Sequence, residues 1–203
     1  MKNRLILIRH SKIDPAQPGA FVGSLNLSLS PAGVEAARGM NIHLDKGSFR
    51  LVCSPLKRAT ETAALLFPGH PMEFDPRLAE IDFGQWENRT FEQIKEESPQ
   101  EVDLWANAPQ EFTFPGGESV PGFIARVEEL ASDLVGQMPE SKTTVAVTHG
   151  GVIRFLVCHL LKLSYERHLS FRCDRPSVNV IDLVDGFATL SGLNLDGYST
   201  ERL

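Results

Sequence analysis

Short apolar runs alternate with longer amphipathic stretches along this chain. Leu5 to Ile8 form an uninterrupted apolar run, Arg50 to Cys53 give a second strand signal, and Thr143 to Thr148 alternate as a third strand. Continuous apolar runs are typical of parallel strands that are buried on both faces, and helical patterns lie between these three. The pattern therefore predicts an α/β protein with a mostly parallel central sheet flanked by helices.

The helical stretches carry recognisable start signals. Residues 30–44 begin with Ser30 and Pro31 and continue at helical spacing, so one helix is predicted there. A second helix is predicted after the second strand, with Ser54 as N-cap and Pro55 at the first helical position. Two further helices are predicted from the apolar face of Phe123, Val127, Leu130 and Leu134 and from the apolar run Val152 to Leu161.

Arg9 and His10 follow the first apolar run, at the carboxyl edge of the predicted sheet, where open α/β folds place their sites. An arginine holds an anion in a forked geometry, and a histidine with an ordinary pKa of ~6.5 is partly neutral and nucleophilic near neutral pH. The pair therefore suggests phosphate chemistry. The alternative is a surface histidine beside a solvated arginine, the commoner explanation of an isolated pair of this kind.

Two further strand ends deliver similar side chains. Arg58 is expected in the first or second turn of its helix, where a positive charge calls for an anion; a solvated ion pair with Glu61 is the alternative. His149 follows the third strand, and Gly150 and Gly151 are expected to form a turn that lets backbone N–H groups approach an anion. The alternatives are a histidine satisfied in the core and glycines that only permit a tight turn.

Five segments of the chain resemble, in order and spacing, the histidine phosphatase superfamily, the group that includes cofactor-dependent phosphoglycerate mutases. They are LIRHS, CSPLKRATETA, AEIDFGQWENRTF, PGGES and VTHGGVIR. The resemblance spans almost the whole chain. It implies one domain over residues 1–203 with a phosphoglycerate mutase-like fold, a three-layer sandwich with a mostly parallel central sheet between helices.

The resemblance also implies roles for the reactive side chains. The histidine of the Arg-His pair becomes phosphorylated in that family, which implicates His10. The family residues that bind the transferred phosphoryl group correspond to Arg9, Arg58 and His149, and the proton donor corresponds to Glu80. No metal and no cofactor is implied.

The residues around Glu80 fit an acid. Apolar side chains close to it in sequence, which favour a protonated carboxyl by partial desolvation, are Leu78, Ile81, Phe83 and Trp86. The alternative is a solvated acidic loop that includes Asp82 and Glu87.

Residues 81–118 are expected to be an inserted helical segment. Thr90 with Gln93, and Ser98 with Glu101, form capping-box patterns that predict two short helices. Because the insertion lies between the candidate acid and the PGGES segment, it is the expected lid or wall over the substrate.

The chain departs from the family pattern at two positions. Ser11 stands where a glycine is usual, and Ala16 stands where an asparagine is usual. The Ser11 hydroxyl is expected to compensate by donating to the phosphate, and the lost asparagine favours phosphatase over closed-pocket mutase chemistry. Weaker substrate contacts are assigned to Gly23, Ser24 and Asn26, and a backbone contact to Gly150; the first three are also ordinary turn residues.

Within the superfamily the chain is most similar to the alpha-ribazole phosphatase group. The tail FRCDRPSVNVIDLVDGFATLSGLN resembles that group's closing strand and hairpin. The resemblance implies a phosphomonoesterase that dephosphorylates alpha-ribazole 5'-phosphate in cobalamin nucleotide-loop assembly. A broad-specificity small-molecule phosphatase is the alternative, because specificity in this superfamily lies in variable loops.

Composition permits this interpretation without selecting it. The chain is 42% hydrophobic, with a mean hydropathy of -0.12 and a net charge of -6, which argues against a nucleic-acid-binding surface. No apolar run approaches the ~20 residues that span a bilayer, and the chain begins with its first strand, so we expect a cytoplasmic protein without membrane contact; a homodimer is left open as its assembly. The three cysteines are expected to be reduced packing residues: Cys53, Cys158 and Cys173.

Three rival functions remain at this stage. A mutase would use the same phosphohistidine but return the phosphoryl group to an isomeric substrate. A metallohydrolase would use His10, His149 and Glu80 as ligands, although no HxxxH or HxH spacing supports one. A phosphate-binding regulator would bind without turnover. Histidines expected to lie outside the site are His43, His70, His159 and His168, and Arg154 is expected to be an ion-pair partner.

Overall fold

The computed structural model describes residues 2–15, 17–44, 49–136 and 143–199. Ala16, one of the two departures from the family pattern, lies outside these ranges.

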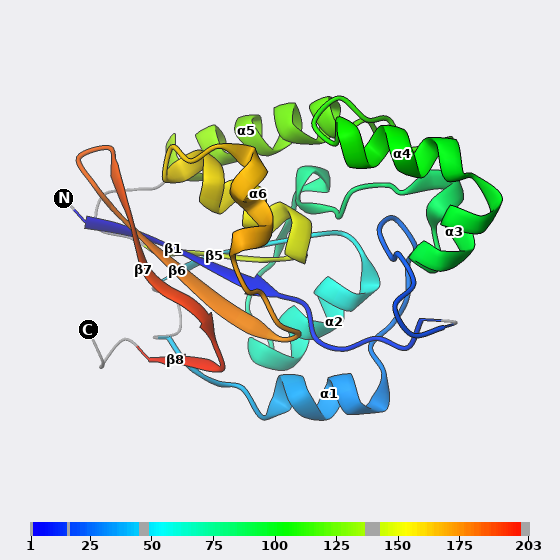
Figure 1. The fold of residues 1–203 in the computed structure, drawn as a ribbon. Coiled ribbons are helices and arrows are strands. Elements are labelled where there is room, and N and C mark those ends of the chain that lie inside the picture. Colours follow the sequence, from blue (N-terminus) through cyan, green and yellow to red (C-terminus); the bar gives the residue numbers. More distant parts are fainter. Residues whose placement is uncertain (1, 16, 45–48, 137–142, 200–203) are drawn as a thin grey trace.

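A six-stranded, mostly parallel sheet forms the centre of the molecule (Figure 1). Its strands lie in the order β4-β3-β5-β1-β6-β7. The parallel strands are β1 (Lys2–Arg9), β3 (Phe49–Cys53), β4 (Glu73–Phe74) and β5 (Thr143–Thr148). The tail adds β6 (Ser177–Val184) and β7 (Phe187–Leu195) as an antiparallel hairpin, as predicted.

Helices cover both faces of the sheet. On one face lie α5 (Val120–Gly136) and α6 (Gly150–Leu160); on the other lie α1 (Pro31–Arg38) and α2 (Lys57–Leu66) (Figure 1). Strand β1 separates the two cores because successive side chains of a strand point to opposite faces. Leu5 and Leu7 belong to the core under α5 and α6, whereas Ile6 and Ile8 belong to the core that includes the buried alanines of α2. The three-layer α/β sandwich expected from the family resemblance is therefore confirmed.

The segment between the acidic candidate and α5 is largely helical. It contains the 3-10 turn η2 (Gly84–Trp86) and the short helices α3 (Phe91–Glu97) and α4 (Pro99–Asn107). Trp86 is 1% exposed and lies at the centre of a group of rings that consists of Phe21, Trp105, Phe112 and Phe114. Aromatic packing rather than sheet contact thus holds this segment together.

Several predicted helix boundaries are wrong. The helix predicted over 30–44 ends at Arg38, and residues Asn41–His43 form strand β2, which pairs with β8 (Gly197–Ser199) of the tail. The final helix begins at Gly150, so no separate turn follows His149. The other elements are η1 (Pro76–Leu78) and η3 (Tyr165–Ser170).

Two predicted caps are also wrong. Helix α2 begins at Lys57 rather than Pro55, and the Ser54 side chain bonds His149 instead of serving as the N-cap. The capping box of Thr90 and Gln93 is confirmed, but Ser98 makes no side-chain cap at the start of α4. Ser54 is bound to a distant residue, His149, whereas Ser98 is the C-cap of the preceding helix α3 and donates its N–H to the Ile94 carbonyl at 2.7 Å.

Cys53, Cys158 and Cys173 are free and buried, as expected of packing residues. Across the described ranges no helix is long and apolar enough to cross a membrane.

Candidate active site

Strand register brings three chain segments to one edge of the sheet. Arg9 lies opposite Thr148, and Cys53 lies opposite Val147, so β1, β3 and β5 end together. The His10 N–H donates to the Thr148 carbonyl at 2.9 Å, which continues the ladder one residue past β1. The residues that follow these strands therefore meet, as the carboxyl edge of a parallel sheet requires.

His10 is 3% exposed and has a defined tautomer. Its Nδ1 donates to the Ser11 carbonyl at 2.7 Å, because that oxygen can only accept. Burial, and then the positive charges of Arg58 and Arg9, hold the pKa of His10 well below its usual range. The ring is therefore neutral at neutral pH, and Nε2 carries a free lone pair, as a nucleophile needs.

Arg58, His149 and Ser54 form a buried chain of hydrogen bonds beside His10. Arg58 Nε donates to His149 Nδ1 at 3.1 Å, which leaves the proton on His149 Nε2, 2.8 Å from the Ser54 hydroxyl. The two imidazole rings lie 5.0 Å apart between centroids. Burial is the main cause that holds the pKa of His149 well below its usual range, and the positive charge of Arg58 adds to it, so this ring is also neutral.

Arg58 is fully buried, so the solvated pair with Glu61 is wrong. Its terminal nitrogens donate to the carbonyls of Leu25 and Gly23, both at 2.6 Å, while the Glu61 carboxylate accepts from the Leu29 N–H. Burial lowers the pKa of Arg58 from its ordinary value. A guanidinium buried in this way is stabilised by an anion.

Arg9 lies against the start of α6. It donates through one terminal nitrogen to the Cys173 carbonyl, and its Nε has no hydrogen-bond partner, alone among buried side-chain polar atoms of the described chain. A Cβ on Gly150 would lie 2.8 Å from Arg9 Cζ. Gly150 is thus required for close packing against Arg9 and not for a turn.

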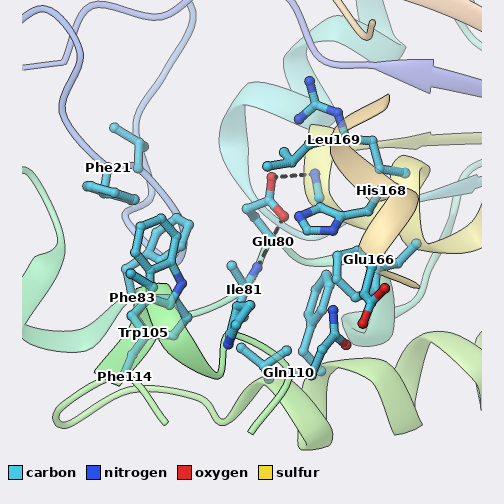
Figure 2. Close-up of a pocket in the computed structure, with 18 of the residues that line it drawn as sticks. Phe21, Glu80, Ile81, Phe83, Trp105, Gln110, Phe114, Glu166, His168 and Leu169 are labelled. Carbon is cyan, nitrogen blue, oxygen red and sulfur yellow. Dashed lines mark hydrogen bonds between the residues drawn. The ribbon is translucent and has the colours of Figure 1, made fainter. Parts of the chain in front are cut away.

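Glu80 is half-buried and its carboxylate is held by two backbone amides (Figure 2). The Gly151 N–H, at the start of α6, donates to Oε2 at 3.0 Å, and the Ile81 N–H donates to Oε1 at 3.2 Å. A Cβ on Gly151 would come within 2.3 Å of Oε1. The two glycines of the VTHGGVIR segment therefore make room for one arginine and one carboxylate.

Two predicted phosphate or substrate ligands, Ser11 and Asn26, make hydrogen bonds within the protein instead. The Ser11 hydroxyl donates its one proton to the Gly33 carbonyl at 2.6 Å, so it is not free to compensate at a phosphate. Asn26 Oδ1 accepts from the Lys57 N–H at 2.7 Å and thereby caps α2. Both residues fix the edges of the site.

Gly23 and Ser24 belong to a loop whose polar groups bind the carboxylates of Glu87 and Asp82. Their N–H groups donate to the Glu87 carboxylate, and the Ser24 hydroxyl donates to Asp82 Oδ1 at 2.9 Å. A Cβ on Gly23 would lie 1.9 Å from the Ile81 carbonyl oxygen. Neither residue lines the cavity described next, in contrast to the expected substrate contacts.

A cavity of about 630 Å³ adjoins these groups and shares Arg9, Glu80 and Gly151 with them. Much of its wall is aromatic (Figure 2): Phe21, Phe83, Trp105, Phe114, Phe123 and Phe155. Several of these side chains come from the 81–118 segment, which forms one wall. Such a volume suits a small-molecule group attached to the phosphate.

Arg154 and His168 line this cavity, so the expectation that they lie outside the site is wrong, and Arg175, which the sequence did not single out, lines it too. Arg154 is one helical turn beyond Gly150, so the i,i+4 spacing on α6 indicates the same face. Its Nε donates to the Phe171 carbonyl at 3.1 Å. His168 and Arg175 come from segments whose approach to the site only the tertiary structure defines.

The arrangement concentrates positive charge around one carboxylate. Burial, and then the positive charge of Arg175, lowers the pKa of Arg9. Burial, and then the positive charge of Arg58, lowers the pKa of Arg175. Within the described ranges no group of three or more His, Cys, Asp or Glu side chains is placed to hold a metal ion. The geometry is that of an anion pocket with a neutral imidazole inside it.

Over residues 5–196 the sequence matches the Histidine phosphatase superfamily (branch 1). The chain belongs to this superfamily. As a histidine phosphatase it is a hydrolase acting on phosphate monoesters, in agreement with the expectation from its motifs.

Two curated histidine phosphatases are similar over most of their length. The adenosylcobalamin/alpha-ribazole phosphatase of Escherichia coli is 32% identical, over 98% of this chain and 99% of that protein. Phosphoserine phosphatase 1 of Hydrogenobacter thermophilus is 29% identical, over 95% of this chain and 92% of that protein. The crystal structure of the alpha-ribazole phosphatase from Shigella flexneri superposes with a TM-score of 0.88 at 32% identity, covering 98% of this chain and all of that one.

Proposed function

We propose that this histidine phosphatase dephosphorylates alpha-ribazole 5'-phosphate through a phosphohistidine on His10. The observation that carries the chemistry is the state of His10, whose Nδ1 is committed to the Ser11 carbonyl and whose ring is neutral among buried arginines.

In the first step His10 Nε2 attacks the phosphorus in line with the ester oxygen. The new N–P bond forms as the P–O bond breaks. Arg9 and Arg58 stabilise the equatorial oxygens, joined by His149 once its Nε2–H turns from the Ser54 hydroxyl to the phosphate, and Glu80 gives its proton to the departing alkoxide. Each donor is expected to contribute ~3 kcal/mol to the transition state, by analogy with single oxyanion donors.

In the second step water attacks the phosphohistidine. Glu80, now ionised, takes a proton from that water, the N–P bond breaks, and inorganic phosphate leaves with His10 neutral again. Both steps use the same donors, and neither uses a metal.

Two observations support the alpha-ribazole substrate. Relatives bearing that name align over nearly the whole chain at 31–32% identity. Alpha-ribazole is a nucleoside with a planar, apolar benzimidazole base, and the cavity beside Glu80 is lined by aromatic rings that can stack on such a base.

A second candidate is a phosphatase of small anionic esters such as phosphoserine. Arg154 and Arg175 line the same cavity and could bind a carboxylate on the leaving group. The similarity to phosphoserine phosphatase 1 favours the same class of substrate.

A substrate panel distinguishes these candidates. Specificity constants measured for alpha-ribazole 5'-phosphate, phosphoserine, 3-phosphoglycerate and an aryl phosphate should be highest for the first. A much higher value for phosphoserine would select the second candidate. Release of free phosphate without a bisphosphate primer would argue against a mutase, and activity in a chelator would argue against a metallohydrolase.

The covalent step is tested separately. Brief reaction with ³²P-labelled substrate and an acid-free quench should leave acid-labile label on the wild type and none on His10→Ala, which should have no turnover. Full activity of His10→Ala would refute the phosphohistidine mechanism whatever the substrate.

A further inference from the structure

Glu80 lies at the end of a connecting segment, where a side chain is not fixed by a helix or a strand. The segment runs from β4 through η1 to Glu80. A proton donor must stay within hydrogen-bond distance of the departing oxygen, and misplacement by about 1 Å can cost about 100-fold in rate. Some feature of the molecule must therefore hold the backbone of this segment.

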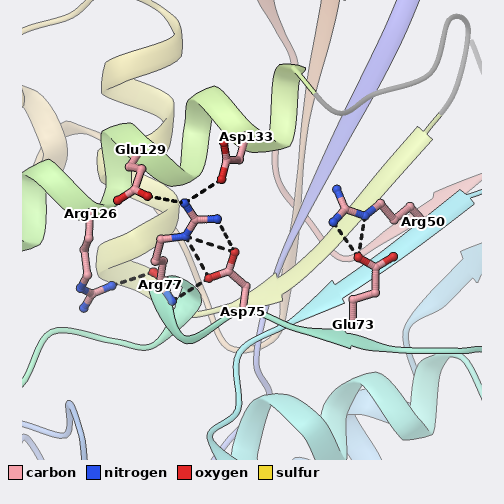
Figure 3. Close-up of polar contacts among 7 residues, drawn as sticks. All are labelled: Arg50, Glu73, Asp75, Arg77, Arg126, Glu129 and Asp133. Atoms are coloured by element: carbon pink, nitrogen blue, oxygen red, sulfur yellow. Dashed lines mark hydrogen bonds and ion pairs between the residues drawn. The ribbon is translucent and has the colours of Figure 1, made fainter.

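Arg126, on α5, binds the backbone of this segment (Figure 3). Its Nη1 donates to the carbonyls of Arg77 and Ala79 at 2.7 and 2.9 Å, and its Nη2 donates to the carbonyl of Glu80 at 3.3 Å. One guanidinium thus binds three backbone oxygens that end at the candidate acid.

Glu118 of the PGGES segment binds the remaining donors of the same guanidinium. Arg126 Nε and Nη2 donate to its two carboxylate oxygens at 2.6 and 2.9 Å. With three backbone acceptors and two carboxylate oxygens, all five N–H donors of Arg126 are used. The guanidinium carbon also lies 4.6 Å from the centre of the Phe123 ring, so its plane is fixed as well.

Arg126 and Glu118 together bind the backbone on both sides of Glu80. Glu118 donates its own N–H to the Asp82 carbonyl at 2.9 Å, and its Oε2 accepts from the Asp82 N–H at 3.4 Å. Arg126 therefore holds residues 77, 79 and 80 directly, and holds residue 82 through Glu118. The Glu80 carboxylate projects from this fixed backbone to the Gly151 N–H.

We propose that Arg126 is a positioning residue that holds Glu80 in the geometry of proton transfer to the leaving group. This inference rests on the proposed role of Glu80 as the acid. Arg126 touches no reacting atom; it acts through the backbone that carries the carboxyl group.

A purely structural role would have a different signature. Loss of stability lowers the amount of active enzyme and affects all substrates alike. Misplacement of an acid affects esters of poor leaving groups, whose alkoxides need a proton, and spares p-nitrophenyl phosphate, whose phenolate leaves without one. The ratio of the two specificity constants therefore reports the position of Glu80.

The chain offers a matched control in Arg77. Its side chain binds Asp75, Glu129 and Asp133 on the outer side of the same segment (Figure 3). Its backbone carbonyl, which Arg126 binds, is retained in Arg77→Gln. This variant removes ion pairs from the segment without releasing Glu80.

The experiment compares kcat/KM, which reports transfer to His10, for an alkyl phosphate and for p-nitrophenyl phosphate. In Arg126→Gln the alkyl ester should lose about 10- to 100-fold and the aryl ester less than about threefold. Arg77→Gln should leave the ratio unchanged. Arg126→Lys, which keeps the charge and one donor group, serves if Arg126→Gln fails to fold, and should shift the ratio in the same direction.

Glu80→Gln distinguishes the acid role of Glu80 from the positioning role of Arg126. It should show the same selective loss, and adding Arg126→Gln to it should change the ratio no further. Equal losses for both esters in the Arg126 variants, beside a selective loss in Glu80→Gln, would overturn the positioning role alone. No selective loss in Glu80→Gln would overturn the acid role and this inference with it.

Discussion

At the scale of single residues, the site consists of buried groups whose neighbours set their protonation. His10 and His149 share a pocket with Arg58, and burial and positive charge both disfavour their charged forms. The sequence motifs identify these residues, but the ring nitrogen that carries the proton is decided for His10 by the adjacent Ser11 carbonyl and for His149 by hydrogen bonds to Arg58 and Ser54 from other segments. The same holds for Ser54 and Ser11, whose hydroxyls bind His149 and the Gly33 carbonyl.

The depressed pKa values of His10 and His149 predict a pH-dependent stability. Below about pH 6.5 the unfolded chain protonates these imidazoles and the native state does not, so stability is lost as pH falls. Each group should contribute about 1.4 kcal/mol per pH unit in that range. Urea midpoints at pH 7.5 and 5.5 should be closer together for His10→Gln than for the wild type; an equal spacing would contradict the assignment.

Gly151→Ala is expected to reduce activity with little loss of stability. The added Cβ would meet Glu80 Oε1 at 2.3 Å and displace the carboxyl group, which should lower kcat/KM for an alkyl ester by about 100-fold. Gly136→Ala is the control, because a Cβ there meets nothing within 4 Å. Comparable activity of the two variants in steady-state assays would show that Glu80 tolerates the displacement.

At the scale of elements, local sequence signals predicted the presence of helices and strands better than the residues at which they begin and end. The strand Thr143–Thr148 and the long helix that carries Phe123 and Leu134 lie where periodicity places them. The helix predicted over 30–44 is cut short because residues after Gly39 find a strand partner near the end of the chain. A partner so distant in sequence leaves no local signature.

The two short helices of the 81–118 segment provide a test of capping. Thr90→Ala removes a side-chain acceptor for the Gln93 N–H and should cost about 1 kcal/mol of unfolding free energy. Ser98→Ala, at the start of α4, should cost much less because Ser98 makes no side-chain cap there. Denaturant unfolding of both variants measures the difference, and equal losses would contradict the observed cap geometry.

At the scale of the whole molecule, strands β1, β3 and β5 end in register and collect positive charge at one edge of a protein whose net charge is -6. The attraction for phosphate is therefore local. Arg175, on the loop before β6, and Arg154, on α6, line the same cavity and add to it.

Inorganic phosphate is consequently expected to stabilise the folded protein. At 100 times its Kd it should add about 2.7 kcal/mol, which corresponds to roughly 5–10 °C in Tm for a chain of this size. Arg9→Met should abolish most of this shift, since the guanidinium is lost. Sodium chloride at equal ionic strength is the control, and a shift of similar size with chloride would indicate general screening instead of a pocket.

The sequence by itself determined the layers and the reactive residues, because apolar periodicity fixes which faces are buried and because four of the five motifs carry Arg9, His10, Arg58, Glu80 and His149. The tertiary structure alone decided how these groups are held. The proton on His149 depends on Arg58 and Ser54, and the Glu80 backbone is held by Arg126 and Glu118. Such contacts join segments far apart along the chain, so their distances and directions follow from packing and not from any local pattern.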